Sequence, residues 1–309
     1  MLLNRPFRLV LMMVMAALVL GPGAAVAEVR TGLTLSSRTL GHRVAYDIYL
    51  PPGYDSDSRD YPVLYLLHGG GTGQPDDWFT LAGIDQLLDR MIGAGEIRPM
   101  IVVAPDGRRN VRNDVATYFL DDADGTSRWE TMFFQDFVPA IEARYRAIGT
   151  GDTRALMGIS MGGLAAVVYQ LHHPDAVAGV AAYSAAFRTQ AQLLGLSPEA
   201  YQLRYGGLLG PGLEGKDRVN DAWRALTPEA LIAGTDRARF ARVPRLWLMT
   251  GAEDPFFEGE AQLHVALRAA GIRDRFLVAD GGHNWPFWRA HLAEGLRHIN
   301  AVLTRDYGE

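Results

Sequence analysis

The sequence predicts an α/β protein, in which helices flank a central, mostly parallel β-sheet. Apolar runs of strand length alternate with amphipathic segments along the chain, and this alternation is typical of a sheet wrapped by helices. Hydrophobic residues make up 48% and charged residues 21% of the 309 residues, so a sizeable core is available and disorder is not expected. Because no repeat or low-complexity linker divides the remainder, we expect one folded domain over residues 28–309.

The first 27 residues have the pattern of a secretory signal peptide. Arg5 and Arg8 precede the apolar run Leu9–Leu20, and Ala25-Val26-Ala27 supplies a small-residue cleavage site. The apolar run is shorter than the roughly 20 residues that a membrane-spanning helix needs. An uncleaved membrane anchor is the alternative interpretation. We therefore expect cleavage after Ala27, export to a bacterial periplasm or to the exterior, and no stable membrane anchor afterwards.

The first half of the fold is expected to contain three strands and a helix. Val44–Leu50 alternates apolar and polar residues like an early antiparallel strand, and Pro51-Pro52-Gly53 ends it. Val63–Leu67 and Met100–Ala104 are uninterrupted apolar runs, which indicates strands buried on both faces. Between them, Ile84–Ile92 carries apolar residues at helical spacing.

The second half continues the alternation. Glu130–Tyr145 is predicted to be an amphipathic helix. The short strand Arg154–Ile159 leads through one residue into the helix Met161–His172, which ends before Pro174. The remaining expected elements are the strands Val177–Tyr183, Arg245–Thr250 and Arg275–Val278 and the closing helix His291–Leu303.

One long segment, about residues 187–242, interrupts this alternation. It lacks a strong strand, and five of its glycines cluster around Pro211. Connections of this length are uncommon in compact domains and usually carry function. We interpret it as a small helical insertion over one end of the sheet, forming a lid or a pocket wall; the alternative is a surface excursion without a role.

The strongest chemical motif is Gly158-Ile159-Ser160-Met161-Gly162, which lies between a predicted strand and a predicted helix. In a G-x-S-x-G sequence a sharp strand-to-helix turn presents the serine hydroxyl, and the glycines permit close packing on either side. The backbone N–H of Met161 then lies at a helix N-terminus, where it can stabilise an oxyanion. Ser160 is therefore the predicted nucleophile.

A nucleophilic serine requires a base, and the base requires a carboxylate to orient it. In hydrolases with this motif the acid and the histidine follow the serine in that order, on loops after later strands. Glu253 and Asp254 follow one such strand, and His283 follows the next. We favour Asp254 as the acid, with Glu253 as the alternative. The histidines outside His283 and the glycine-rich segment are interpreted as solvated or capping residues.

The glycine-rich segment His68-Gly69-Gly70-Gly71 follows the strand Val63–Leu67. Successive glycines let backbone N–H groups approach a developing negative charge. The expected oxyanion hole consists of the N–H of Met161 and an N–H from this loop, that of Gly70. His68 itself is interpreted as structural.

Composition and motifs exclude several other classes of function. The formal net charge of -5 gives no electrostatic footprint for nucleic acid. The absence of cysteine excludes disulfides, thiolate metal sites and a cysteine nucleophile. Asp122-x-Asp124-Gly125 partly mimics a calcium loop, but Leu120 and Thr131 occupy its first and twelfth ligand positions. We therefore expect no metal and no cofactor.

Several segments of the sequence match the motifs of one known family. They are Tyr49–Tyr54, Tyr61–Gly69, Pro105–Gly107, Trp129–Thr131, Asp136–Pro139, Arg144–Arg146, Gly158–Gly163 and Gly281–His283. These residues resemble the esterase branch of the α/β-hydrolase superfamily, which includes esterase D-like enzymes, feruloyl esterases, enterochelin esterases and mycolyltransferases. The resemblance implies an α/β-hydrolase fold, with Ser160 as nucleophile, Asp254 as acid and His283 as base. Many relatives carry Asn-Ser where this chain has Asp121-Asp122.

The predicted function is that of an exported serine carboxylic-ester hydrolase, acting on a small-molecule or carbohydrate-linked ester. Trp285 and Trp223 are expected to be pocket walls. The first alternative is an acyltransferase that passes the acyl group to a sugar hydroxyl, as the mycolyltransferases do. The second is a catalytically inactive binding module, which an intact set of three site residues disfavours. The sequence does not predict the oligomeric state.

Overall fold

A computed structural model describes residues 26–109, 115–240 and 245–303. All but the last two residues of the predicted signal peptide lie outside these ranges. Among the residues described, no helix combines the length and the apolar character needed to cross a membrane.

The centre of the protein is an eight-stranded sheet with the strand order β1-β2-β4-β3-β5-β6-β7-β8. Strand β2 pairs antiparallel with both β1 and β4, and all other neighbours are parallel. The predicted α/β class is thereby confirmed. The strands are β1 (Glu28–Ser36), β2 (Arg43–Leu50), β3 (Val63–Leu67), β4 (Ile101–Pro105), β5 (Arg154–Ile159), β6 (Gly179–Tyr183), β7 (Leu246–Gly251) and β8 (Asp274–Ala279).

Strand β1 was not expected from the sequence, because Leu35 is its only buried hydrophobic residue. It is an edge strand that forms a hairpin with β2, and its register shifts between Arg30 and Leu33. An edge strand with a polar outer face gives a weak hydrophobic pattern, since its backbone pairing, rather than its burial, holds it in place.

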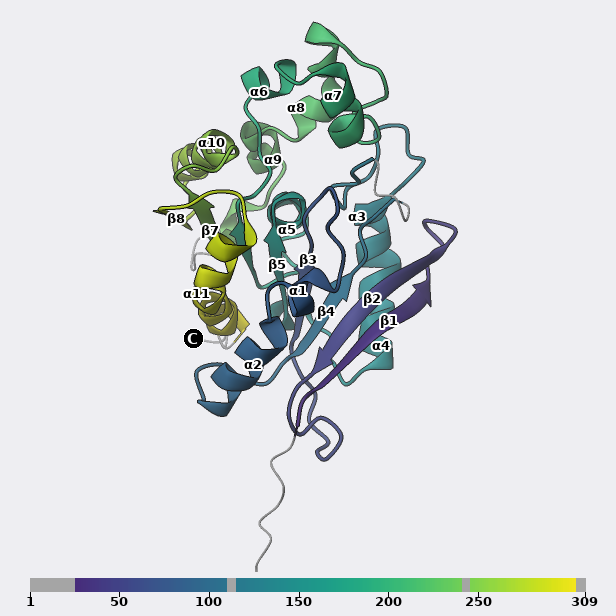
Figure 1. Cartoon of the computed structure of the whole chain (residues 1–309), viewed down its shortest axis with the longest axis vertical. Coiled ribbons are helices and arrows are strands. Elements are labelled where there is room, and N and C mark those ends of the chain that lie inside the picture. The colour runs from purple at the N-terminus through teal and green to yellow at the C-terminus, as the bar shows by residue number, and fades with distance from the viewer. Residues whose placement is uncertain (1–25, 110–114, 241–244, 304–309) are drawn as a thin grey trace, which may run out of the picture.

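Helices cover both faces of the sheet (Figure 1). One face packs against α2 (Ile84–Gly93) and α11 (Trp285–Leu303). The other packs against α5 (Met161–His172), α10 (Phe257–Ala269) and a continuous helical stretch. That stretch is α3 (Trp129–Met132), a π-helical turn (Phe133–Phe137) and α4 (Val138–Arg144), over the residues for which one helix was predicted. The short helix α1 (Asp77–Thr80) precedes α2.

Helix α11 begins at Trp285, whereas the sequence predicted a start at His291. Pro286 is the second residue of the helix, and a proline in the first turn lacks only an N–H that would have no helical partner there. The helix therefore starts directly after the loop that carries His283.

Besides two 3₁₀-helical turns, the described part of the segment between β6 and β7 contains four short α-helices, which form a cap above one end of the sheet (Figure 1). Each of these helices has a side-chain N-cap, provided by Thr189, Ser197, Asn220 and Thr227, which satisfies an amide of the first turn. The helices are α6 (Gln190–Leu194), α7 (Pro198–Tyr205), α8 (Asp221–Ala225) and α9 (Pro228–Ala233).

Candidate active site

Ser160 occupies a strained turn between β5 and α5, with φ 52° and ψ −115°. A Cβ at Gly158 would lie 2.1 Å from the Gly162 carbonyl oxygen, and a Cβ at Gly162 would lie 2.1 Å from the Leu67 carbonyl oxygen. Only glycine fits at these two positions. The Ser160 amide donates to the Tyr183 carbonyl over 2.9 Å, which ties the turn to β6. A positive φ at a non-glycine residue persists only where its surroundings impose it.

Three side chains from different loops form a continuous hydrogen-bonded chain. The Nε2 atom of His283 lies 2.8 Å from Ser160 Oγ, and its Nδ1 atom lies 2.9 Å from Asp254 Oδ2. Because an ionised carboxylate can only accept, Nδ1 carries the proton of a neutral ring and Nε2 is left to accept the serine hydroxyl proton. The structure thus brings together the three residues predicted from the sequence. The side chain of the alternative acid, Glu253, is exposed and forms no hydrogen bond or ion pair with His283.

The Asp254 carboxylate is completely buried. Burial alone would raise its pKa, but the hydrogen bonds from His283, from Ser184 and from the Phe256 amide outweigh that effect and lower the pKa below its usual value. Asp254 is therefore ionised at neutral pH and can stabilise a positively charged imidazole.

Two aromatic rings hold the His283 ring edge-on, those of Phe256 and Trp288, each with its centroid 5.0 Å away. Trp288 also donates from Nε1 to Ser184 Oγ over 2.8 Å. These positioning residues were missed at the sequence level, since aromatic residues in a core helix and in a loop carry no distinguishing pattern.

Met161 and Gly70 both line the cavity above Ser160. A Cβ at Gly70 would lie 3.6 Å from the Met161 Cβ, so the glycine-rich loop packs against the start of α5. Neither amide donates a hydrogen bond to any residue in the described part of the chain. The two predicted oxyanion-hole residues are thus neighbours with free donors.

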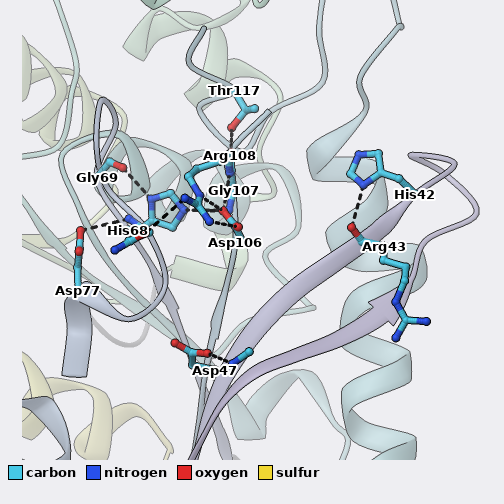
Figure 2. Close-up of polar contacts among 12 residues, drawn as sticks. His42, Arg43, Asp47, His68, Gly69, Asp77, Asp106, Gly107, Arg108 and Thr117 are labelled. Atoms are coloured by element: carbon cyan, nitrogen blue, oxygen red, sulfur yellow. Dashed lines mark hydrogen bonds and ion pairs between the residues drawn. The ribbon is translucent and has the colours of Figure 1, made fainter. Parts of the chain in front are cut away.

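His68 supports this loop from below (Figure 2). Its ring is fully buried, its Nδ1 atom lies 2.7 Å from the Gly69 carbonyl oxygen, and its Nε2 atom accepts from the Gly107 amide over 2.9 Å. A ring that donates at Nδ1 and accepts at Nε2 is neutral. Arg108 braces the same region by pairing with Asp106 over 2.7 Å and donating to Gln74 over 3.3 Å.

A cavity of about 390 Å³ opens onto Ser160 and His283. The predicted pocket walls, Trp223 and Trp285, are not among its lining residues. Trp223 is buried against Tyr205 inside the cap, and Trp285 packs against Trp78 and Trp288. The lining consists of Gly70, Gly71, Ala116, Tyr118, Ser160, Met161, Ala186, Arg188, Leu203, Arg204, Pro255, Phe256 and His283.

Glu260 lies under the site and was not anticipated from the sequence, because a glutamate in an amphipathic helix is normally solvated. It is fully buried in α10, and its Oε1 atom accepts from the Ala185 amide over 2.9 Å. Burial, assisted by the negative charge of Asp254, raises its pKa well above the usual value, although the nearby Thr250 hydroxyl and the hydrogen bond from the Ala185 amide oppose the rise. The protein therefore favours a neutral carboxyl group at this position.

Glu260→Gln should reduce the loss of folding stability that accompanies a rise in pH. Because the folded-state pKa exceeds the unfolded-state value of about 4.5, the folded wild type retains a proton that the unfolded chain releases, and stability falls as pH rises above that value. The glutamine variant lacks this loss, which has a limiting slope of about 1.4 kcal/mol per pH unit. Urea unfolding between pH 4.5 and 8 measures the difference. Glu258→Gln, at an exposed position on the same helix, is the control; equal pH slopes for Glu260→Gln and wild type would contradict the prediction.

Comparison with known proteins gives a consistent result. The profile of the family described as "Putative esterase" matches residues 37–299. Esterase Rv1288 of Mycobacterium tuberculosis is 31% identical over 260 residues, covering 79% of this chain and 53% of that protein. An endo-1,4-beta-xylanase/feruloyl esterase of Xylanibacter ruminicola is 27% identical over 268 residues, covering 84% of this chain and 30% of that protein. A solved ferulic acid esterase superposes with a TM-score of 0.73 at 28% identity, covering 90% of this chain and 99% of that chain.

The chain spans about half the length of the mycobacterial relative. Its likeness to the ferulic acid esterase structure, in contrast, covers nearly the whole of both chains. Since the family profile covers most of the sequence and the topology agrees with the fold that the sequence predicted, the chain belongs to the putative-esterase family of the α/β-hydrolase superfamily.

Proposed function

We propose that this protein is a serine carboxylic-ester hydrolase. The observation that supports this proposal most directly is the unbroken hydrogen-bonded chain from buried Asp254 through His283 to Ser160, which borders an open cavity. The family relationship and the names of the relatives point to the same class of reaction. A cavity of about 390 Å³ is within the range of pockets that bind small molecules.

In the proposed mechanism, Ser160 Oγ attacks the ester carbonyl carbon while its proton moves to Nε2 of His283. The carbonyl oxygen becomes an oxyanion, which accepts hydrogen bonds from the amides of Met161 and Gly70. The imidazolium, stabilised by Asp254, then gives its proton to the departing alcohol as the ester C–O bond breaks. Water adds to the acyl-enzyme by the same route in reverse, releasing the carboxylic acid and restoring Ser160.

The direct test is the release of p-nitrophenol from p-nitrophenyl esters of increasing acyl length, together with hydrolysis of methyl ferulate, which the ferulic acid esterase relative suggests. We expect turnover of at least one ester with the free acid as product. Parallel reactions containing a sugar acceptor test the acyltransferase alternative, because a transferase would accumulate the sugar ester. Failure to turn over any ester would contradict the proposal.

The identity of the acid gives a sharper test of the same site. Asp254→Asn should lower kcat by about 10³–10⁴-fold, because a neutral amide cannot stabilise the imidazolium and can hold the wrong tautomer of His283. Glu253→Gln is the matched control and should change kcat less than about twofold, since this side chain is exposed and lies outside the hydrogen-bonded chain. The reverse ranking of the two variants would transfer the role to Glu253.

A further inference from the structure

The cavity above Ser160 is lined by two arginines and by no aspartate or glutamate of the described chain. We propose that it selects esters that carry a carboxylate, held by Arg188 with Arg204 at the mouth. This inference rests on the proposed function and assigns a substrate class to the same site. The excess of positive charge is a local property of this cavity lining, because the chain as a whole has a formal net charge of -5.

Arg188 lacks the carboxylate partner that three other partly buried arginines of this protein have. Arg108, Arg109 and Arg154 have side chains that are 24%, 23% and 17% exposed, and each forms an ion pair with a carboxylate. Arg188 is also partly buried, but it forms no ion pair and no hydrogen bond that meets normal geometry with any described residue, and its Nε atom is buried without a partner. Because Arg188 lines the cavity and its buried Nε–H has no acceptor in the described chain, an acceptor oxygen of a bound ligand would satisfy this donor.

Arg188 lies close to the catalytic base, with only the Phe256 ring between them. Its guanidinium lies over the Phe256 ring, 4.6 Å from the centroid, and the same ring contacts His283 edge-on at 5.0 Å. A carboxylate bound by Arg188 would therefore lie one aromatic ring away from the base. The planar fork of a guanidinium matches the two oxygens of a carboxylate, which favours bidentate binding.

Arg204 provides a second positive charge from the cap. It lies in the last turn of α7, its side chain is exposed, and it forms no ion pair with the described residues. An exposed cation contributes attraction that salt screens, so its effect should be smaller than that of Arg188 and should weaken as ionic strength rises.

The experiment compares carboxylate esters with neutral amide esters of the same shape. On the acyl side, the pair is the mono-p-nitrophenyl ester of adipic acid and that of its monoamide; on the alcohol side, it is 4-acetoxybenzoate and 4-acetoxybenzamide. We expect kcat/KM to favour the carboxylate member of at least one pair by about 10-fold to 100-fold, mainly through KM. The responding pair shows which side of the ester carries the anion.

Arg188→Gln should reduce that preference by about tenfold or more, and Arg188→Lys should restore part of it, because lysine keeps the charge and loses the fork. Arg204→Gln should reduce the carboxylate preference by a smaller factor. Because Arg204 is exposed, this variant should fold normally even if Arg188→Gln does not. Arg224→Gln, at an exposed position on cap helix α8, is the control and should leave the ratio unchanged.

Turnover of both members of each pair at equal rates by the wild type would overturn the inference and leave the proposed function intact. A carboxylate preference that survives in Arg188→Gln would also overturn it, because Arg188 would then only pack on Phe256. Absence of turnover for all four esters by an enzyme that hydrolyses simple p-nitrophenyl alkanoates would overturn the inference alone, whereas absence of turnover for every ester tried would contradict the proposed function itself.

Discussion

Ser160→Ala should reduce kcat for p-nitrophenyl ester hydrolysis by about 10⁵–10⁶-fold, the largest loss expected from any single substitution at this site. Without Oγ no acyl-enzyme can form, and His283 and Asp254 are left without a nucleophile to activate. The residual rate would come from the oxyanion-binding amides and from substrate binding alone. Because removal of one methylene-bound hydroxyl leaves the backbone turn in place, folding should be preserved.

The measurement pairs steady-state kinetics with labelling by a fluorophosphonate probe, which reacts with activated serines. The wild type should incorporate one probe per chain, and Ser160→Ala should incorporate none. Ser197→Ala, at the N-cap of α7 in the cap, is the control and should retain labelling. Appreciable turnover or labelling of the Ser160→Ala protein would show that another residue is the nucleophile.

Gly162→Ala is expected to have the largest effect on stability, with a loss of about 3 kcal/mol or more. The new Cβ would lie 2.1 Å from the Leu67 carbonyl oxygen and 2.7 Å from that of His68. These are backbone atoms at the end of β3, so relief requires moving α5 away from the sheet rather than rotating a side chain. The displacement would also separate Met161 from Gly70, so activity should fall with stability.

Gly93→Ala is the matched control for this substitution. Gly93 ends α2, its Cβ would meet nothing within 4 Å, and alanine is favoured over glycine in a helix by about 0.5–1 kcal/mol. Chemical denaturation should therefore show opposite changes for the two variants. A Gly162→Ala protein as stable as the wild type would mean that the packing of α5 on β3 is looser than the structure indicates.

The features that were predictable from the sequence share one property: their signal is local. Buried parallel strands such as Val63–Leu67 are uninterrupted apolar runs, and the turn at Ser160 is marked by glycines that the geometry requires. The order of Ser160, Asp254 and His283 along the chain then follows from the topology of the sheet, because each residue follows the carboxyl end of its own strand.

The features that the sequence did not reveal depend on contacts between distant segments. Strand β1 is held by pairing with β2, and Glu260 is buried only because α10 packs beneath the site. The cavity lining depends on how the cap folds, so Trp223 turned inward against Tyr205 while Arg188 came to border the cavity. The spacing of apolar residues along the sequence cannot predict these contacts, because it does not show which neighbouring element each face of a helix or strand packs against.

The sequence separation of the site residues has a consequence for the maturation of the protein. Ser160 and His283 are 123 residues apart, and His283 lies between β8 and α11, the last strand and helix described. A ribosome delivers the nucleophile long before the base. Even a chain whose strands up to β7 were already paired would lack a proton acceptor for Ser160. The appearance of esterase turnover during refolding would therefore report that β8 and α11 have packed onto the rest of the protein. The proposed activity could then be used to follow the last stage of folding.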